Sequence, residues 1–339
     1  MTYHARRTNG ISADRPAVLP QIPAVFANLP HFYHAIQRRA SAFAVNGLAL
    51  AALSSADGQQ PAPSRAAPPP PDVYLASVKV ERGRPLVAAP LNITDRPGYD
   101  NQPSFTADGH GVYFTSVRED AQADIYRYDI ATKRTTRVTA TAPESEYSAT
   151  PIEGGRAISV VRVERDSTQR LWRFPLNGDA PTVILERVRP VGYHAWADEH
   201  TLALFVLGSP NSLQLADTRT GAADTIATGI GRSLQRIPAT NRISFVRKVT
   251  ATEWWIESLD PTTRATTRLV RLPESVEDYA WFPTGSIICG RGSRLLWWSG
   301  KTGDDWREIA ELSAAGVHGI TRLAVSARGD RLALVADGK

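Results

Sequence analysis

From residue 72 onward, the chain alternates short runs of β-type residues with turn residues. Val, Ile, Thr, Leu and aromatic side chains recur in short runs, and Gly, Pro, Asp or Asn residues separate these runs. No helical period is sustained, and alternation of this kind is typical of strands and hairpins. The segment PSFTADGHGVYF at 103–114 shows the pattern, because an Asp-Gly turn joins two apolar runs. We therefore expect an all-β domain.

The hairpins repeat at an even spacing. One apolar residue precedes the first turn of each unit, and we call these the phase residues: Phe105, Ile152, Trp196, Ile237, Trp281 and Val325. They follow one another at steps of 47, 44, 41, 44 and 44 residues. In each complete unit, a first strand enters this turn, a second leaves it, and two more strands follow. A four-stranded propeller blade has this length, whereas a sandwich or jelly roll would need no such period.

The two ends of the repeat array complement each other. The sixth unit stops after two strands, whereas residues 72–94 have the form of a third and a fourth strand with a longer loop between them. We therefore predict a six-bladed β-propeller of four-stranded blades. Its ring is closed by N-terminal strands at about 72–94 that pair with C-terminal strands at about 320–336. Such closure protects strand edges that would otherwise be open to aggregation.

The residues before the repeats differ in composition. We expect a disordered lead at 1–56 with a candidate signal segment, a Pro/Ala-rich linker at 57–71 and the propeller at 72–339. The candidate signal has an Arg pair at 38–39, an apolar run at 40–53 and small residues at 54–56. Its apolar run is too short to span a bilayer permanently. We expect an exported protein, periplasmic or secreted; an amphipathic or disordered lead on a cytoplasmic protein is the alternative.

The first complete unit resembles a known repeat. Residues 98–139, GYDNQPSFTADGHGVYFTS…DIYRYDIATKRTTRVT, are similar to the repeat of TolB-like β-propellers, which follows the pattern Pro-x-apolar-Ser-Pro-Asp-Gly-x-x-apolar. The resemblance covers about 72–339, and spacing carries it more than identity in the units at 192–270. It implies the propeller part only, without the α/β domain that precedes the propeller of TolB itself. A scaffold resembling WD-repeat proteins is the alternative.

Composition argues against several functions. The net charge is +5, and the basic residues are spread along the chain. A nucleic-acid-binding protein usually gathers them on one helix or face, so we do not expect nucleic-acid binding. Cys289 is the one cysteine, so no intramolecular disulfide or Cys/His zinc site of the usual spacing can form, and we expect a buried thiol. The chain has no Gly-x-Ser-x-Gly elbow, P-loop, HExxH or GxGxxG motif. We therefore expect neither an enzyme nor a bound cofactor.

The loops that enter the first strand of each unit offer candidate binding residues. The symmetry of the repeat brings these loops to one face around the central channel. The candidates combine aromatic area with a few charges, as protein recognition requires: Tyr99, Asp100, Tyr147, Tyr193, His194, Arg236, Asp278, Tyr279 and His318. We expect a monomeric propeller that binds a protein partner through this face, without nucleic acid and without a permanent membrane span.

Other interpretations of the same residues stay open. The tyrosines could pack between blades, the two aspartates could cap turns, and His194 could be a hydrogen-bonded packing residue. The two histidines and two aspartates could instead hold a metal ion, although we expect none. The channel mouth could also bind a carbohydrate, a peptide or another small ligand, or hydrolyse it. That function requires several of these residues to converge in one pocket with perturbed pKa values.

Overall fold

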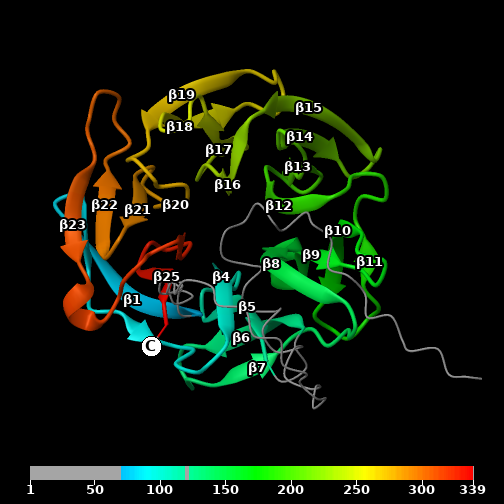
Figure 1. Cartoon of the computed structure of the whole chain (residues 1–339), viewed down its shortest axis with the longest axis horizontal. Helices are drawn as coiled ribbons and strands as arrows, with labels where there is room; N and C mark the ends of the chain where they lie inside the picture. Colours follow the sequence, from blue (N-terminus) through cyan, green and yellow to red (C-terminus); the bar gives the residue numbers. More distant parts are fainter. Residues whose placement is uncertain (1–69, 119–121, 339) are drawn as a thin grey trace, which may run out of the picture.

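Six antiparallel sheets surround a central axis in the computed structural model of the chain (Figure 1). The structure describes residues 70–118 and 122–338. Within the first five blades, strands that follow one another in sequence pair with one another, and the first strand lies nearest the axis. This arrangement confirms the six-bladed propeller that the repeat predicts.

The first three blades follow one another in chain order. The first blade contains β4 (Tyr99–Phe105), β5 (Gly111–Val117), β6 (Ala123–Asp129) and β7 (Thr135–Arg137). The second blade contains β8 (Ser145–Ile152), β9 (Ala157–Val163), β10 (Gln169–Pro175) and β11 (Thr182–Val183). The third blade contains β12 (Val191–Trp196), β13 (Thr201–Val206), β14 (Ser212–Asp217) and β15 (Ala222–Thr228).

The last three blades complete the ring. The fourth blade contains β16 (Ile230–Arg236), β17 (Ile243–Lys248), β18 (Trp254–Leu259) and β19 (Thr266–Arg271). The fifth blade contains β20 (Tyr279–Trp281), β21 (Ile287–Arg291), β22 (Arg294–Trp298) and β23 (Arg307–Glu311). The sixth blade contains β24 (Arg322–Val325), β25 (Arg331–Asp337), β1 (Pro71–Glu81), β2 (Arg84–Val87) and β3 (Leu91–Asn92). Two short 3-10 turns, η2 (Glu153–Gly155) and η3 (Ser313–Ala315), lie in connections.

The Asp-Gly turn of the first blade closes as a tight hairpin. The Gly109 amide donates to the Thr106 carbonyl at 2.9 Å, and Gly109 has a φ of 72°, which a residue without a Cβ adopts at little cost. The Gly111 amide donates to the Thr106 hydroxyl at 2.9 Å. This turn fixes the C-terminal end of β4. The other end of the strand, at Tyr99, is therefore the end that follows the entering loop.

The sixth blade joins the two ends of the chain. β1 pairs antiparallel with β25, from Pro71 opposite Asp337 to Ser77 opposite Arg331, and the C-terminus lies beside β1 in Figure 1. Both β2 and β3 pair with β1, so the outer strand of this blade is split in two. The predicted closure by N-terminal strands is confirmed. The longer loop expected between them is not found, because the extra residues lengthen the hairpin of β1 and β2, which closes at Arg82 and Gly83.

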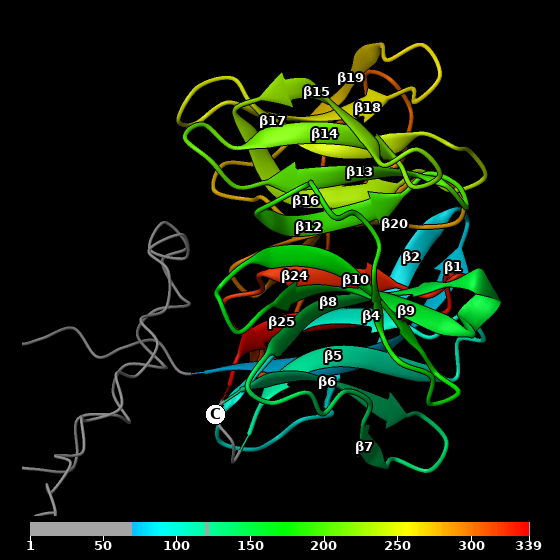
Figure 2. The same cartoon turned by 90° about the vertical axis from the view of Figure 1, so that its right-hand side faces the viewer.

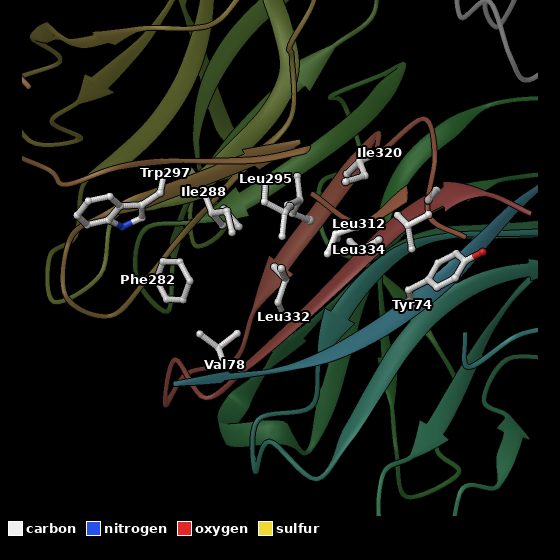
Figure 3. Close-up of a cluster of buried hydrophobic side chains, with 14 residues drawn as sticks. Tyr74, Val78, Phe282, Ile288, Leu295, Trp297, Leu312, Ile320, Leu332 and Leu334 are labelled. Atoms are coloured by element: carbon white, nitrogen blue, oxygen red, sulfur yellow. The ribbon is translucent and has the colours of Figure 1, made fainter. Parts of the chain in front are cut away.

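The hydrophobic core lies between neighbouring blades. Figure 2 shows the first, second and third blades stacked along the ring from the side. Figure 3 shows the interface between the fifth and sixth blades, where Trp297 and Ile288 lie on one side and Leu332 and Leu334 on the other. Successive side chains on a strand point to opposite faces, so Cys289 joins the cluster on the other side of its blade. Cys289 is fully buried, as the sequence predicts.

Among the described residues, no helix is long and apolar enough to span a bilayer. The candidate signal segment lies outside the part of the chain that the structure describes, as does the Pro/Ala-rich linker apart from its last two residues. The boundaries proposed for these segments therefore remain predictions.

Candidate functional site

The inner strands of all six blades begin at the same end of the channel, and each blade places a polar or aromatic side chain there. We call this set the mouth ring, in blade order: Tyr99, Tyr147, Tyr193, Arg232, Asp278 and Arg322. The first residue lies in β4, the next three lie in β8, β12 and β16, Asp278 immediately precedes β20, and the last begins β24. The phenol of Tyr99 is influenced electrostatically by ring members from four other blades. Strand starts that are far apart in the sequence therefore form one site.

Ion pairs connect three blades across this mouth. Both Nε and Nη2 of Arg232 donate to Asp278 Oδ2, with Nε at 3.2 Å. Arg322 Nη1 lies 3.7 Å from Asp278 Oδ1, and its Nη2 donates to the Tyr193 hydroxyl at 2.7 Å. The Arg322 guanidinium also lies 5.0 Å from the centre of the Tyr193 ring. Since these two residues belong to the sixth and third blades, their contact crosses the channel mouth.

A second layer of charge supports the ring from the fourth and fifth blades. Glu277 accepts a hydrogen bond from the Arg232 backbone amide at 2.8 Å, and Lys248 Nζ lies 3.0 Å from the same carboxylate. The Lys248 ammonium also lies 4.2 Å from the centre of the Trp254 ring. These contacts hold the Arg232 backbone in place and therefore fix the position of its guanidinium at the mouth.

Two tyrosines of the ring, Tyr99 and Tyr147, are neutral at ordinary pH. Burial raises the pKa of Tyr99 well above its usual value, although the nearby Arg322 and Arg232 act in the opposite direction. Burial also raises the pKa of Tyr147 to about 12. Burial by itself would lower the pKa of Arg232, but Asp278, Tyr193 and Glu277 together outweigh this effect and raise the pKa. The mouth therefore presents the neutral phenols of Tyr99 and Tyr147 beside the charged guanidinium of Arg232.

Asp100 lies beside the mouth but is buried within the first blade. Its side chain is fully buried, and Arg96 Nη2 lies 3.4 Å from its Oδ1. Burial raises the pKa of this carboxyl group, while a hydrogen bond from Ser116 and the nearby Arg96 lower it. The same guanidinium nitrogen of Arg96 donates to Ser116 Oγ at 2.8 Å. The arrangement fastens the loop before β4 to β5.

His194 and Tyr279 lie between blades. His194 Nε2 lies 2.7 Å from Ser159 Oγ of the second blade, and Trp196 Nε1 donates to the same oxygen at 3.0 Å. A Ser–His pair at this distance resembles the nucleophile and base of a hydrolase. However, Ser159 is fully buried, and burial lowers the pKa of His194 to about 3. In the fourth and fifth blades, Tyr279 takes the place of the histidine and donates to Ser244 Oγ at 2.8 Å. The repeated contact therefore packs neighbouring blades against each other.

The other two candidates are not members of the mouth ring. Arg236 ends β16, beside the hairpin turn to β17, and bonds to Thr240 and Asn241 in that turn. Its assignment to the mouth face is therefore corrected, because β16 already begins at Ile230 and carries Arg236 to the opposite end. His318 is exposed in the loop before β24. Among the described residues, no group of three His, Cys, Asp or Glu side chains could hold a metal ion, so the structure does not bring the two histidines and two aspartates together.

The structure adds Arg232, Glu277 and Arg322 to the site. Arg322 was detectable in the sequence, because it stands three residues before a phase residue. Tyr193 and Asp278 have the same spacing from their own phase residues. In these three blades, spacing from the turn therefore identifies the residue at the mouth.

A shallow pocket of about 310 Å³ lies on the second blade, beside Glu144, Arg162 and Trp172. The Arg162 guanidinium lies 4.6 Å from the centre of a Trp172 ring, and it forms ion pairs with Glu144 at 3.6 Å and Glu146 at 3.2 Å. The Arg162 guanidinium is therefore paired within the blade, and the mouth ring is the stronger candidate site.

Fold and mouth together define a class of protein, a six-bladed β-propeller with a charged and aromatic channel mouth. The propeller is TolB-like. The structure of putative TolB from Agrobacterium tumefaciens is similar to it with a TM-score of 0.59 and 12% identity, covering 79% of this chain and 99% of that chain. At this identity the likeness shows the fold alone, and it confirms the fold that the repeat resemblance implies.

Two further structures with this fold belong to proteins of different kinds. An oligogalacturonate lyase in complex with manganese has a TM-score of 0.51 and 15% identity, covering 74% of this chain and 80% of that chain. A chain of a nidogen/laminin complex has a TM-score of 0.51 and 12% identity, covering 78% of this chain and 98% of that chain. No protein-family model and no curated protein matches the sequence. The fold is therefore shared by an enzyme and by a component of a protein complex.

Proposed function

We propose that this chain is a non-enzymatic protein-binding propeller whose recognition face is the channel mouth. The observation that carries the proposal is the mouth ring itself, in which all six blades place tyrosine, arginine or aspartate side chains at one end of the channel. Tyrosine and arginine are enriched among the residues that dominate binding energy at protein interfaces. Tyrosine supplies rigid area with a polar tip, and arginine supplies a planar fork of donors.

The buried Ser–His pair does not support a hydrolase. A nucleophile must reach its substrate, and Ser159 is fully buried with its oxygen already engaged by His194 and Trp196. Small-ligand binding or an enzymatic activity at the mouth is the alternative function, and an oligogalacturonate lyase has this fold. The compact Arg232–Asp278 network favours this alternative, since such a network can orient a polar ligand.

We also propose that the protein is exported to the cell envelope. The Arg pair, apolar run and small residues at 38–56 support this location. Mass spectrometry of the protein from its native host tests the proposal. A mature N-terminus near Asp57 in a periplasmic or secreted fraction is expected, and an intact chain beginning at Met1 in the cytoplasm would refute export.

Affinity capture with the full chain tests protein binding at the mouth. The experiment compares the unchanged protein with Tyr193→Ala and Asp278→Ala, and with Arg236→Ala as the matched control at the other end of an inner strand. We expect the control to capture the same partners as the unchanged protein, and the mouth variants to lose them. Circular dichroism verifies that each variant is folded. Capture that survives both mouth variants would refute the choice of face.

A further inference from the structure

The mouth carries one more positive charge than negative charge. The described cationic groups at this site are Arg232, Lys248 and Arg322, and the carboxylates are Glu277 and Asp278. Lys248 lies against Glu277 at 3.0 Å, and Arg232 is bonded to Asp278 through two nitrogens. The surplus therefore rests on Arg322, whose nearest contact with Asp278 is 3.7 Å. A cation of low exposure is costly when it is not matched by a close anion.

Arg322 is also short of hydrogen-bond acceptors. A guanidinium has five N–H donors in a planar fork, and the bond to the Tyr193 hydroxyl uses one of them. Within residues 70–118 and 122–338, no second hydrogen bond from this guanidinium is present. Its side chain is 13% exposed and lies beside the phenol that it bonds. The group is therefore held in place with most of its donors unused.

From this charge surplus and these unused donors, we infer that Arg322 anchors the carboxylate of a peptide at the channel mouth. The inference deepens the proposed protein-binding function and rests on it. A carboxylate accepts two parallel N–H bonds from a guanidinium fork, and such charge-assisted bonds are stronger than neutral ones. The phenol of Tyr193, which Arg322 already bonds, provides the adjoining surface for the residue that carries or neighbours the carboxylate.

The charge count favours a carboxylate over a phosphate group. A carboxylate brings one negative charge and balances the surplus at the mouth. A phosphate group brings nearly two negative charges at neutral pH, and Asp278 and Glu277 would repel the excess. The carboxylate can belong to an Asp or Glu side chain or to the chain terminus of the partner, and both sources present the same chemical group.

Calorimetric titration of the full chain with synthetic peptides separates these sources. One pair consists of an acetylated Ser-Gly-Leu-Ser-Leu peptide with a free C-terminal carboxylate and the same peptide with a C-terminal amide. The second pair is amidated and carries either Glu or Gln in the central position. We expect the charged member of at least one pair to bind about tenfold more tightly than its neutral counterpart. The preferred pair identifies the source of the carboxylate.

Variants of the anchor complete the test. Arg322→Gln is expected to abolish the tenfold preference, Arg322→Lys to retain only part of it because lysine lacks the fork, and the control Arg236→Gln to leave it unchanged. Equal affinity within both pairs, no binding by any peptide at millimolar concentration, or an unchanged preference in Arg322→Gln would overturn the inference. Competition by inorganic phosphate at lower concentration than the acidic peptides would overturn it as well. If partner capture still depends on Tyr193 and Asp278 in any of these cases, the proposed function stands and the carboxylate anchor alone fails.

Discussion

One serine oxygen connects the fourth and fifth blades. Ser244 is fully buried, and its Oγ accepts hydrogen bonds from the Tyr279 hydroxyl and from Trp281 Nε1, each at 2.8 Å. Its own hydroxyl proton is donated to the Gln235 carbonyl at 3.1 Å. A serine hydroxyl offers one donor and two acceptor positions, so all three are used. We predict that Ser244→Ala destabilises the propeller far more than the loss of one small polar group at the surface would.

The expected magnitude follows from the donors that lose their partner. The Tyr279 hydroxyl would be left buried without an acceptor, which costs about 1–3 kcal/mol. Trp281 is half-buried, so its N–H can recover part of its hydrogen bonding with water, and it adds about 1 kcal/mol or less. The free energy of unfolding should therefore fall by about 1–4 kcal/mol, which is large against the usual stability of a folded domain.

Urea unfolding followed by tryptophan fluorescence measures this change, with Tyr279→Phe as the matched variant. Tyr279→Phe removes the donor but leaves Ser244 bonded to Trp281, so we expect a loss of about 0.5–1.5 kcal/mol. In the double variant no buried hydroxyl lacks an acceptor in this interface, so its loss should be smaller than the sum of the single losses by about 1 kcal/mol. Additive losses, or a Ser244→Ala protein within 0.5 kcal/mol of the unchanged one, would refute the reasoning.

Three further predictions concern other buried groups. A Cβ added at Gly290 would lie 2.6 Å from Ile320 Cβ, so Gly290→Ala should lower the free energy of unfolding by about 1–3 kcal/mol in the same urea assay. The pKa of His194 is lowered to about 3, so below pH 6.5 the unfolded state takes up a proton that the folded state does not. The contribution of His194 to the free energy of unfolding should therefore fall by about 1.4 kcal/mol per pH unit as the pH falls from 6.5 toward 3. In a His194→Gln protein, the free energy of unfolding should fall less steeply over this range. Burial raises the pKa of the Cys289 thiol, so a thiol reagent should label the protein only in denaturant; rapid labelling of the folded protein would contradict this.

The fold could be predicted because its signal is repeated. The phase residues mark the end of each inner strand. A strand end that is ambiguous in one unit can therefore be placed from its position in the other units. The closure could be predicted because residues 72–94 supply the two strands that the sixth unit lacks. The contacts that join β1 to β25 depend on this complementarity rather than on any local motif.

The candidate site could be predicted only in part, because bulges interrupt several inner strands. The register of β12 shifts between Val191 and Tyr193, and that of β8 shifts between Tyr147 and Thr150. A shift of one residue exchanges the faces on which all following side chains lie. Sequence alone therefore could not decide that Tyr193 faces the mouth while its neighbour His194 lies between blades.

The serine contacts between blades have a signal in the sequence. Two phase residues are tryptophans, and each stands 37 residues after a serine that accepts its indole N–H: Trp196 after Ser159, and Trp281 after Ser244. Both serines follow an isoleucine in the second strand of the preceding blade. An indole N–H needs an acceptor when it is buried, so a tryptophan at this position predicts a serine in the adjacent blade. The aliphatic phase residues have no N–H to satisfy.

Distance from the phase position separates core positions from candidate binding positions. At the phase position every unit has an apolar residue, as packing between blades requires. Three residues earlier, three blades carry Tyr193, Asp278 and Arg322 at equivalent positions. Packing alone would favour similar apolar residues there, and placing charged groups where they are poorly exposed costs free energy. Since the scaffold does not need this mixture, its presence supports the proposal that the mouth ring recognises a ligand with complementary charge.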